Sequence, residues 1–255
     1  MTIIQAIIIA IVEGLTEFLP VSSTGHMILT SSLLGVENNS FLKTFEISIQ
    51  LGAILAIVIM YAKRFLRNFE IYKKLIIAFI PTAIIGFLAY GFIKEYLFNP
   101  IIVSVTLILG GIILILVDKR LITQVSKYKE LEDVSLKHAL YIGLIQCISM
   151  IPGVSRAGAT IVGGVFNGFN KKQAIEFSFL LAVPTMFAAT GYDLLKTPIE
   201  FNNNEVTLLI IGLITAFIVA WIAVKAFLAF IEKFGFAYFG WYRILIGLLF
   251  LAFVH

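Results

Sequence analysis

The sequence predicts an all-α integral membrane protein: an inverted-topology repeat with six transmembrane helices and two re-entrant helix–loop–helix hairpins. Of its 255 residues, 60% are hydrophobic and 13% are charged, whereas soluble domains average roughly 45–50% apolar and about 25% charged residues. The charged residues gather in short loops between apolar runs. A single cysteine, Cys147, excludes a disulfide framework, and we expect it to serve helix packing.

Long apolar runs supply the spanning helices. A helix that crosses a bilayer needs about 20 mostly apolar residues. Six segments meet this requirement, at 45–62, 75–93, 100–117, 174–194, 206–226 and 237–254.

Two further apolar regions, at 3–35 and 138–168, are interrupted in the middle by Pro, Gly, Ser and Thr. We interpret each as helix, sharp turn, helix. Such a pair enters the membrane and returns to the same side, and its broken backbone is tolerated only where protein or a watery cavity covers it.

Basic residues indicate the orientation. If both broken regions are re-entrant, one side receives Lys63, Arg64, Arg67, Lys73, Lys74, Lys119, Arg120, Lys127, Lys129, Lys137, Lys171, Lys172, Lys225 and Lys233. The opposite side receives Lys43, Lys94 and Lys196. The positive-inside rule makes the first side cytoplasmic and both termini external. The net charge of +4 therefore indicates contact with anionic lipid and no nucleic-acid partner.

A weak internal repeat supports this layout. Residues 45–53 echo residues 175–183, with Glu at the second position and Ser at the fourth position of both. We expect one membrane domain, 1–255, made of repeats 1–118 and 138–255 joined by a charged cytoplasmic loop, 119–137. Each repeat crosses the membrane three times, so the second is inverted, as in many transporters. The two hairpin tips then meet near the midplane.

The first tip carries two carboxylates, Glu13 and Glu17, on one helical face. Two carboxylates in a low dielectric must share a proton or a cation. Oxygen ligands favour Mg²⁺ or Ca²⁺, with the remaining ligands from water and phosphate. A polar helix contact or a proton relay is the alternative.

The return helix of the first tip opens with hydroxyl residues. Ser22, Ser23 or Thr24 can cap it, and a helix start binds phosphate readily. His26 lies within a turn of these hydroxyls and can act as base, acid or nucleophile. A purely structural histidine is the alternative.

The second tip also has a helix start that carries hydroxyl residues. Ser155 is the expected N-cap, and the hydroxyl of Thr160 follows one turn later. The guanidinium of Arg156 suits bidentate phosphate binding. Its alternative role, a salt bridge to Glu13 or Glu17, is compatible with phosphate binding.

Other polar residues of the spans are weaker candidates. Gln50 and Glu46 either support the site from a second layer or join helices. Trp241, Tyr242 and Arg243 are interpreted as an interfacial anchor, with Arg243 snorkelling to the cytoplasmic surface.

The sequences E-G-L-T-E-F-L-P-V-S-S-T-G-H at 13–26, P-G-V-S-R-A-G-A-T at 152–160 and F-S-F-L-L-A-V-P at 177–184 resemble the bacterial undecaprenyl-diphosphate phosphatase family associated with bacitracin resistance. The resemblance covers the whole chain, although Ala157 stands where many relatives have serine. It implies hydrolysis of the C55 isoprenoid diphosphate to the monophosphate, which recycles the lipid carrier for cell-wall synthesis. It also implies a divalent-metal requirement and a site toward the outer face of the bacterial cell membrane. Carried over by motif, it places in the active site Glu13, Glu17, Ser23, His26, Ser155, Arg156 and Thr160.

Two mechanisms stay open from the sequence. Either Ser23, activated by His26, attacks the terminal phosphorus, or His26 activates water directly. Arg156 and the two helix starts hold the diphosphate, while a cation between Glu13 and Glu17 neutralises charge.

Two other functions compete with this one. A secondary transporter or polyprenyl-phosphate flippase shares the inverted repeat. An acid phosphatase of the phosphatidate-phosphatase type is disfavoured, because no histidine follows Arg156 before His255. The expected partners are a polyprenyl diphosphate lipid and membrane lipids, and a homodimer stays open.

Overall fold

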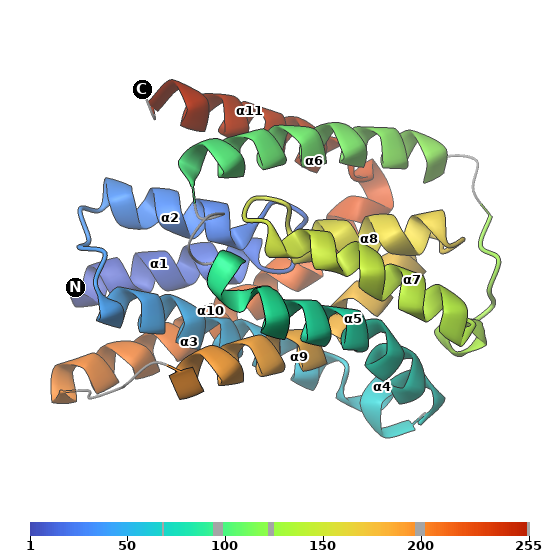
Figure 1. Cartoon of the computed structure of the whole chain (residues 1–255), viewed down its shortest axis with the longest axis horizontal. Coiled ribbons are helices and arrows are strands. Elements are labelled where there is room, and N and C mark those ends of the chain that lie inside the picture. Colours follow the sequence, from blue (N-terminus) through green and yellow to red (C-terminus); the bar gives the residue numbers. More distant parts are fainter. Residues whose placement is uncertain (68, 94–98, 122–124, 197–201, 254–255) are drawn as a thin grey trace.

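The computed structural model describes residues 1–67, 69–93, 99–121, 125–196 and 202–253; Lys94 of the topology argument lies outside them. These residues form helices and no strands (Figure 1). In chain order the elements are α1 (Ile3–Thr16), α2 (Ser23–Leu33), α3 (Ser40–Met60), α4 (Ala62–Arg67), α5 (Glu70–Phe92), α6 (Pro100–Leu121), η2 (Leu131–Asp133), α7 (Leu136–Gln146), η3 (Cys147–Met150), α8 (Arg156–Phe166), α9 (Lys171–Lys196), α10 (Asn203–Phe234) and α11 (Ala237–Phe253).

Five helices are long and apolar enough to cross a membrane: α3, α5, α6, α9 and α10. Their outward faces expose large apolar side chains such as Leu88, Leu116 and Ile222, which suits contact with lipid. The predicted class, an all-helical multi-pass membrane protein, is confirmed. The sixth predicted span corresponds to α11, whose 17 residues extend about 26 Å at 1.5 Å per residue.

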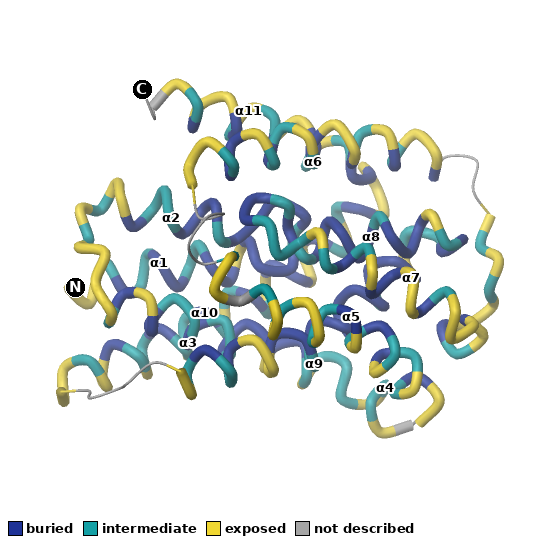
Figure 2. Tube along the Cα trace, viewed as in Figure 1, coloured by how far each residue is buried: buried dark blue, intermediate teal, exposed yellow. Residues whose placement is uncertain are grey.

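Both broken regions form the predicted helix–turn–helix pairs. α1 and α2 make one hairpin, and α7 and α8 make the other. Their turns meet in the middle of the molecule (Figure 1), where the chain is mostly buried (Figure 2). The start of α1 and the end of α11 lie at one end of the molecule, and α4 and residues 125–135 lie at the other (Figure 1).

The two turns share an unusual backbone. Ser22 and Ser155 have φ angles of 72° and 75°, and within the described residues they are the non-glycine residues with positive φ. Each immediately precedes a return helix. Such a conformation costs about 1–2 kcal/mol outside glycine, so the surrounding structure must hold it. Strain of this kind is concentrated at functional sites.

Close helix packing holds the tips in place. α1 lies against α10 at Gly14, where an added Cβ would come within 2.8 Å of the Ala216 carbonyl oxygen. α6 and α11 approach at Gly111 and Gly240, where a Cβ on Gly111 would lie 2.5 Å from the Gly240 carbonyl oxygen. Any larger residue at these positions would push the helices apart.

Candidate active site

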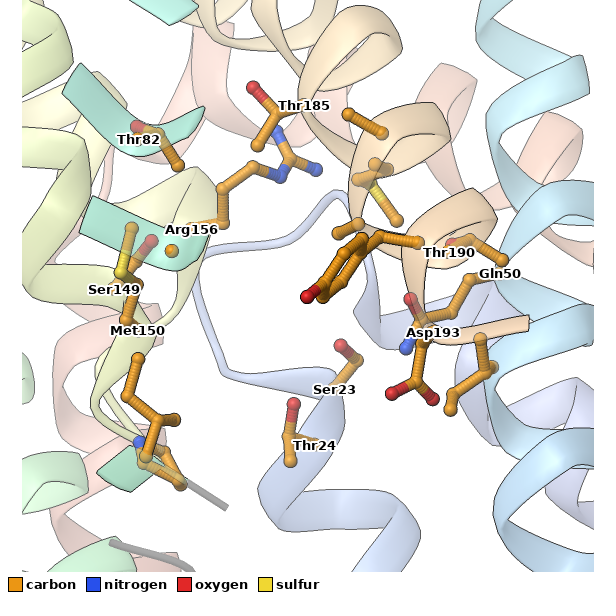
Figure 3. Close-up of a pocket in the computed structure, with 18 of the residues that line it drawn as sticks. Ser23, Thr24, Gln50, Thr82, Ser149, Met150, Arg156, Thr185, Thr190 and Asp193 are labelled. Carbon is orange, nitrogen blue, oxygen red and sulfur yellow. The ribbon is translucent and has the colours of Figure 1, made fainter. Parts of the chain in front are cut away.

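A cavity of about 540 Å³ lies between the two hairpin tips and helices α3, α5 and α9 (Figure 3). Its polar end is formed by Glu17, Ser22, Ser23, Thr24, Ser155 and Arg156. The remaining wall is largely apolar and includes Phe79, Ala83, Phe87, Met150, Met186 and Ala189. An anionic head group and a hydrocarbon tail would each find a matching surface here.

The carboxylate of Glu17 joins the two tips at the polar end of the cavity. The Ser23 hydroxyl donates to Glu17 Oε2 at 2.5 Å, and Arg156 Nη2 donates to Glu17 Oε1 at 3.1 Å. The salt bridge offered as an alternative role for Arg156 therefore forms, with Glu17. The other terminal nitrogen of Arg156 donates to the Ser178 carbonyl oxygen, and its guanidinium lies 5.5 Å from the ring centre of Phe18.

Glu13 lies behind Glu17 and is completely buried. Among the described residues, no donor reaches either of its carboxylate oxygens, and its carboxyl group adjoins that of Glu17. A buried carboxylate without donors needs a proton or a cation. The donor chemistry of the pair suits either a shared proton or a divalent cation, the two alternatives that the sequence offered. No cluster of three or more His, Cys, Asp or Glu suited to a metal occurs in the described parts of the chain.

His26 is held by a backbone carbonyl and a tyrosine hydroxyl. Its Nδ1 lies 2.8 Å from the Ser22 carbonyl oxygen, which can only accept, so Nδ1 carries the proton. Nε2 then accepts from the Tyr242 hydroxyl at 2.7 Å, and the two rings are stacked. Ser23 and His26, which act together in one of the two mechanisms left open by the sequence, are not hydrogen-bonded to each other: the serine donates to Glu17, and both ring nitrogens of His26 have other partners.

The two helix starts differ in how they are capped. The Ser155 hydroxyl accepts from the Gly158 backbone N–H at 3.1 Å, which confirms the predicted N-cap. Ser22 holds the corresponding position before α2 but makes no side-chain cap. The first N–H groups of α2 therefore receive no acceptor from their capping residue and stay suited to an anion.

The remaining candidates are divided between the cavity and its surroundings. Gln50 lines the cavity. Glu46 accepts from the Ser31 hydroxyl at 2.8 Å and does not line it. Thr160 is 1% exposed, and its hydroxyl donates to Ser178 Oγ at 2.6 Å. Thr160 thus supports the residue that holds Arg156 and does not face the cavity.

The interpretation of Arg243 as a snorkelling residue is wrong. Its side chain is 1% exposed and donates to backbone carbonyls in both hairpin tips. Its neighbour Tyr242 contacts His26, whereas Trp241 is 63% exposed, as an anchor would be. Helix α11 crosses behind the tips, which places two of the three residues inward.

The site predicted from the sequence did not include three polar residues on α9. Thr185, Thr190 and Asp193 line the cavity from α9 (Figure 3). All three lie within the predicted span 174–194. Polar groups at membrane depth are a recognised functional signal, and this signal could have identified them.

Comparison with known proteins identifies the family of this chain. The family described as Bacitracin resistance protein BacA matches residues 6–249. The chain is 56% identical over 257 residues to an undecaprenyl-diphosphatase of Aquifex aeolicus, with 99% of each chain covered. It is 48% identical to the enzyme of that name from Bdellovibrio bacteriovorus (100% of this chain and 97% of the other), and 52% identical to that of Wolinella succinogenes (100% and 99%). The chain belongs to the Bacitracin resistance protein BacA family.

Proposed function

We propose that this protein hydrolyses undecaprenyl diphosphate to undecaprenyl phosphate and inorganic phosphate. The observation that carries the proposal is the Glu17 carboxylate, which holds both a hydroxyl, Ser23, and a guanidinium, Arg156, at the polar end of a largely apolar cavity. The relatives named undecaprenyl-diphosphatase support the choice of substrate.

The polar end of the cavity binds the diphosphate. The Arg156 guanidinium lines this end of the cavity and suits charge-assisted hydrogen bonds to phosphate oxygens. The N–H groups at the start of α2 add fixed donors, and the dipoles of α2 and α8 favour negative charge at their starts. The prenyl tail lies along the apolar wall, where Phe79, Phe87 and Met186 exclude water.

Ser23 is the nucleophile and Glu17 is its base. Ser23 Oγ attacks the terminal phosphorus, and its proton passes to Glu17 Oε2, with which it is already hydrogen-bonded. The bond from the terminal phosphorus to the bridging oxygen breaks, and undecaprenyl phosphate leaves. Glu17 gives this proton up to the departing product, takes a proton from the water that attacks the phosphoserine, and returns it to Ser23 Oγ as inorganic phosphate leaves. His26, held by Tyr242, keeps α2 in place.

Glu13 and Glu17 would hold the divalent cation, Mg²⁺ or Ca²⁺. Its support is the buried Glu13 carboxylate, which no described donor reaches. When bound, the cation would neutralise charge on the phosphate oxygens.

The proposed topology is an inverted repeat in the bacterial cell membrane, with both termini and the cavity mouth outside. Each half has a hairpin followed by three long helices, which supports the repeats 1–118 and 138–255 and the linking loop 119–137. The cavity lining reaches Ile93 and Asp193, near the ends of α5 and α9. These ends lie away from the basic start of α9, which supports an external opening.

Phosphate release from C55-diphosphate by detergent-solubilised protein tests the proposal, because detergent abolishes any gradient that a transporter would need. We expect turnover by the wild type, a loss of about 100-fold or more in Ser23→Ala, and a phosphorylated Ser23 in acid-quenched samples by mass spectrometry. Absence of wild-type turnover would contradict the function. Turnover by Ser23→Ala with an inactive His26→Ala would transfer the reaction to water activated by His26.

A further inference from the structure

Arg243 is a buried cation that the proposed chemistry does not use. It lies on α11, is 1% exposed and forms no ion pair with a described carboxylate. An arginine carries five N–H donors. All five are used on backbone carbonyl oxygens: Nε on Leu107 at 3.3 Å, Nη1 on Pro20 at 2.9 Å and Val154 at 3.0 Å, and Nη2 on Thr106 at 3.2 Å and Gly153 at 2.8 Å.

Two of these carbonyls occupy equivalent places in the two tips. Pro20 lies two residues before Ser22, and Gly153 lies two residues before Ser155. Those serines carry the positive φ angles of 72° and 75°. One guanidinium therefore holds the same point of both strained turns, and it also binds α6. The carbonyl dipoles compensate its charge, which would otherwise be costly at this depth.

The surrounding helices leave room for this side chain. A Cβ added at Gly110 of α6 would lie 2.1 Å from Arg243 Nη2 and 2.7 Å from Cζ. The close approach of α6 to α11 at Gly111 and Gly240 brings the arginine to that backbone. The guanidinium can therefore occupy this position only because residue 110 is a glycine.

We propose that Arg243 is a positioning residue that clamps the two hairpin tips from behind. On the cavity side, Glu17 links Ser23 at the start of α2 to Arg156 at the start of α8. On the opposite side, Arg243 sets the separation and orientation of the same two helix starts. The clamp rests on the proposed function, because its effect is on attack by Ser23 at a phosphorus held by Arg156.

Lysine cannot replace the clamp. Its ammonium has three donors, so at least two of the five buried carbonyls lose their partner. Arg243→Lys keeps the charge and removes the planar fork, and it separates a positioning role from a simple electrostatic one.

The test is a kinetic cycle on the full chain in detergent, with undecaprenyl diphosphate as substrate. We compare Arg243→Ala, Arg243→Lys, Gly110→Ala and Gly110→Ala/Arg243→Ala. Gly91→Ala is the control, because a Cβ there meets nothing within 4 Å. Rates are normalised to monodisperse protein whose unfolding temperature has been measured. Misplacement of reacting groups by about 1 Å can cost on the order of 100-fold in rate, so we expect kcat to fall by about this factor in both Arg243 variants, with little change in KM.

Gly110→Ala should lower kcat in the same way, because its methyl group displaces the guanidinium. In the Arg243→Ala background the same methyl should cost nothing more. If Arg243→Ala does not fold, the cycle is run with Arg243→Lys, which lacks Nη2 and should reduce the Gly110→Ala penalty.

Wild-type kcat in Arg243→Ala, full activity in Arg243→Lys, or losses that multiply in the double variant would each overturn the clamp. An inactive wild type would instead contradict the proposed function, so the two failures are distinguishable.

Discussion

The hydroxyl of Ser23 lies 2.5 Å from Glu17 Oε2. Glu17 follows the last residue of α1 and Ser23 is the first residue of α2, so a single turn brings the nucleophile and its base together. Arg156 reaches the same carboxylate from the other half of the chain, 139 residues away. Half of the reaction geometry is therefore local, and the other half depends on how the two hairpins meet.

Replacement of Glu17 by Gln should lower phosphate release by about 100-fold or more, because the amide cannot accept the serine proton. The measurement is initial rate in detergent, normalised to folded protein. Glu176→Gln is the matched control, since Glu176 pairs with Arg64 away from the cavity. Equal losses in both variants would contradict a specific role for Glu17.

Replacement of Arg156 by Lys should raise KM for undecaprenyl diphosphate by about tenfold or more, because a charged hydrogen bond contributes about 1.5–3 kcal/mol. A lysine also lacks the planar guanidinium whose two terminal nitrogens donate to Glu17 and to the Ser178 carbonyl oxygen. Arg64→Lys tests the general effect of shortening an arginine outside the cavity. An unchanged KM in Arg156→Lys would exclude Arg156 from substrate binding.

Tyr242→Phe keeps the stacked ring but removes the hydroxyl that donates to His26 Nε2. One hydrogen bond contributes about 0.5–1.5 kcal/mol, so we expect phosphate release to fall roughly two- to tenfold. Tyr238→Phe, on the same helix and 59% exposed, should retain the wild-type rate. A wild-type rate in Tyr242→Phe would show that the reaction does not need the hydrogen bond from α11 to His26.

Removal of divalent cations by a chelator should abolish phosphate release, and added Mg²⁺ or Ca²⁺ should restore it. Glu13→Ala should raise the cation concentration needed for half-maximal rate, because it removes one of the two carboxylates proposed to hold the cation. The measurement is a cation titration of both proteins. Full activity in chelator would remove the cation from the mechanism.

Gly143→Ala should destabilise the second hairpin. An added Cβ would lie 2.1 Å from the Ala78 carbonyl oxygen, and overpacking costs roughly 1–3 kcal/mol. We expect a lower unfolding temperature in detergent. Gly191→Ala, whose Cβ meets nothing within 4 Å, should unfold at or above the wild-type temperature, because alanine favours helix. A drop of equal size in both would contradict the packing argument.

Much of the site could be inferred from adjacent residues. The pairing of Glu13 with Glu17 follows from helical spacing, and the cap at Ser155 follows from its place before a helix. The partner of Ser23 did not follow, because both Glu17 and His26 lie within reach of a serine in this turn. The fold of the turn at Pro20 and Ser22 selects Glu17.

Hydropathy and helix-breaking residues were sufficient to identify the membrane class, five long apolar helices and the two broken regions, because these are properties of short segments. The inward direction of Tyr242 and Arg243 needed the packed structure. Arg243 donates to Pro20, 223 residues earlier, and that contact exists only because the glycines of α6 and α11 let these helices approach. An arginine beside a tryptophan and a tyrosine is compatible with either a lipid interface or a buried clamp, and helix packing selects between them.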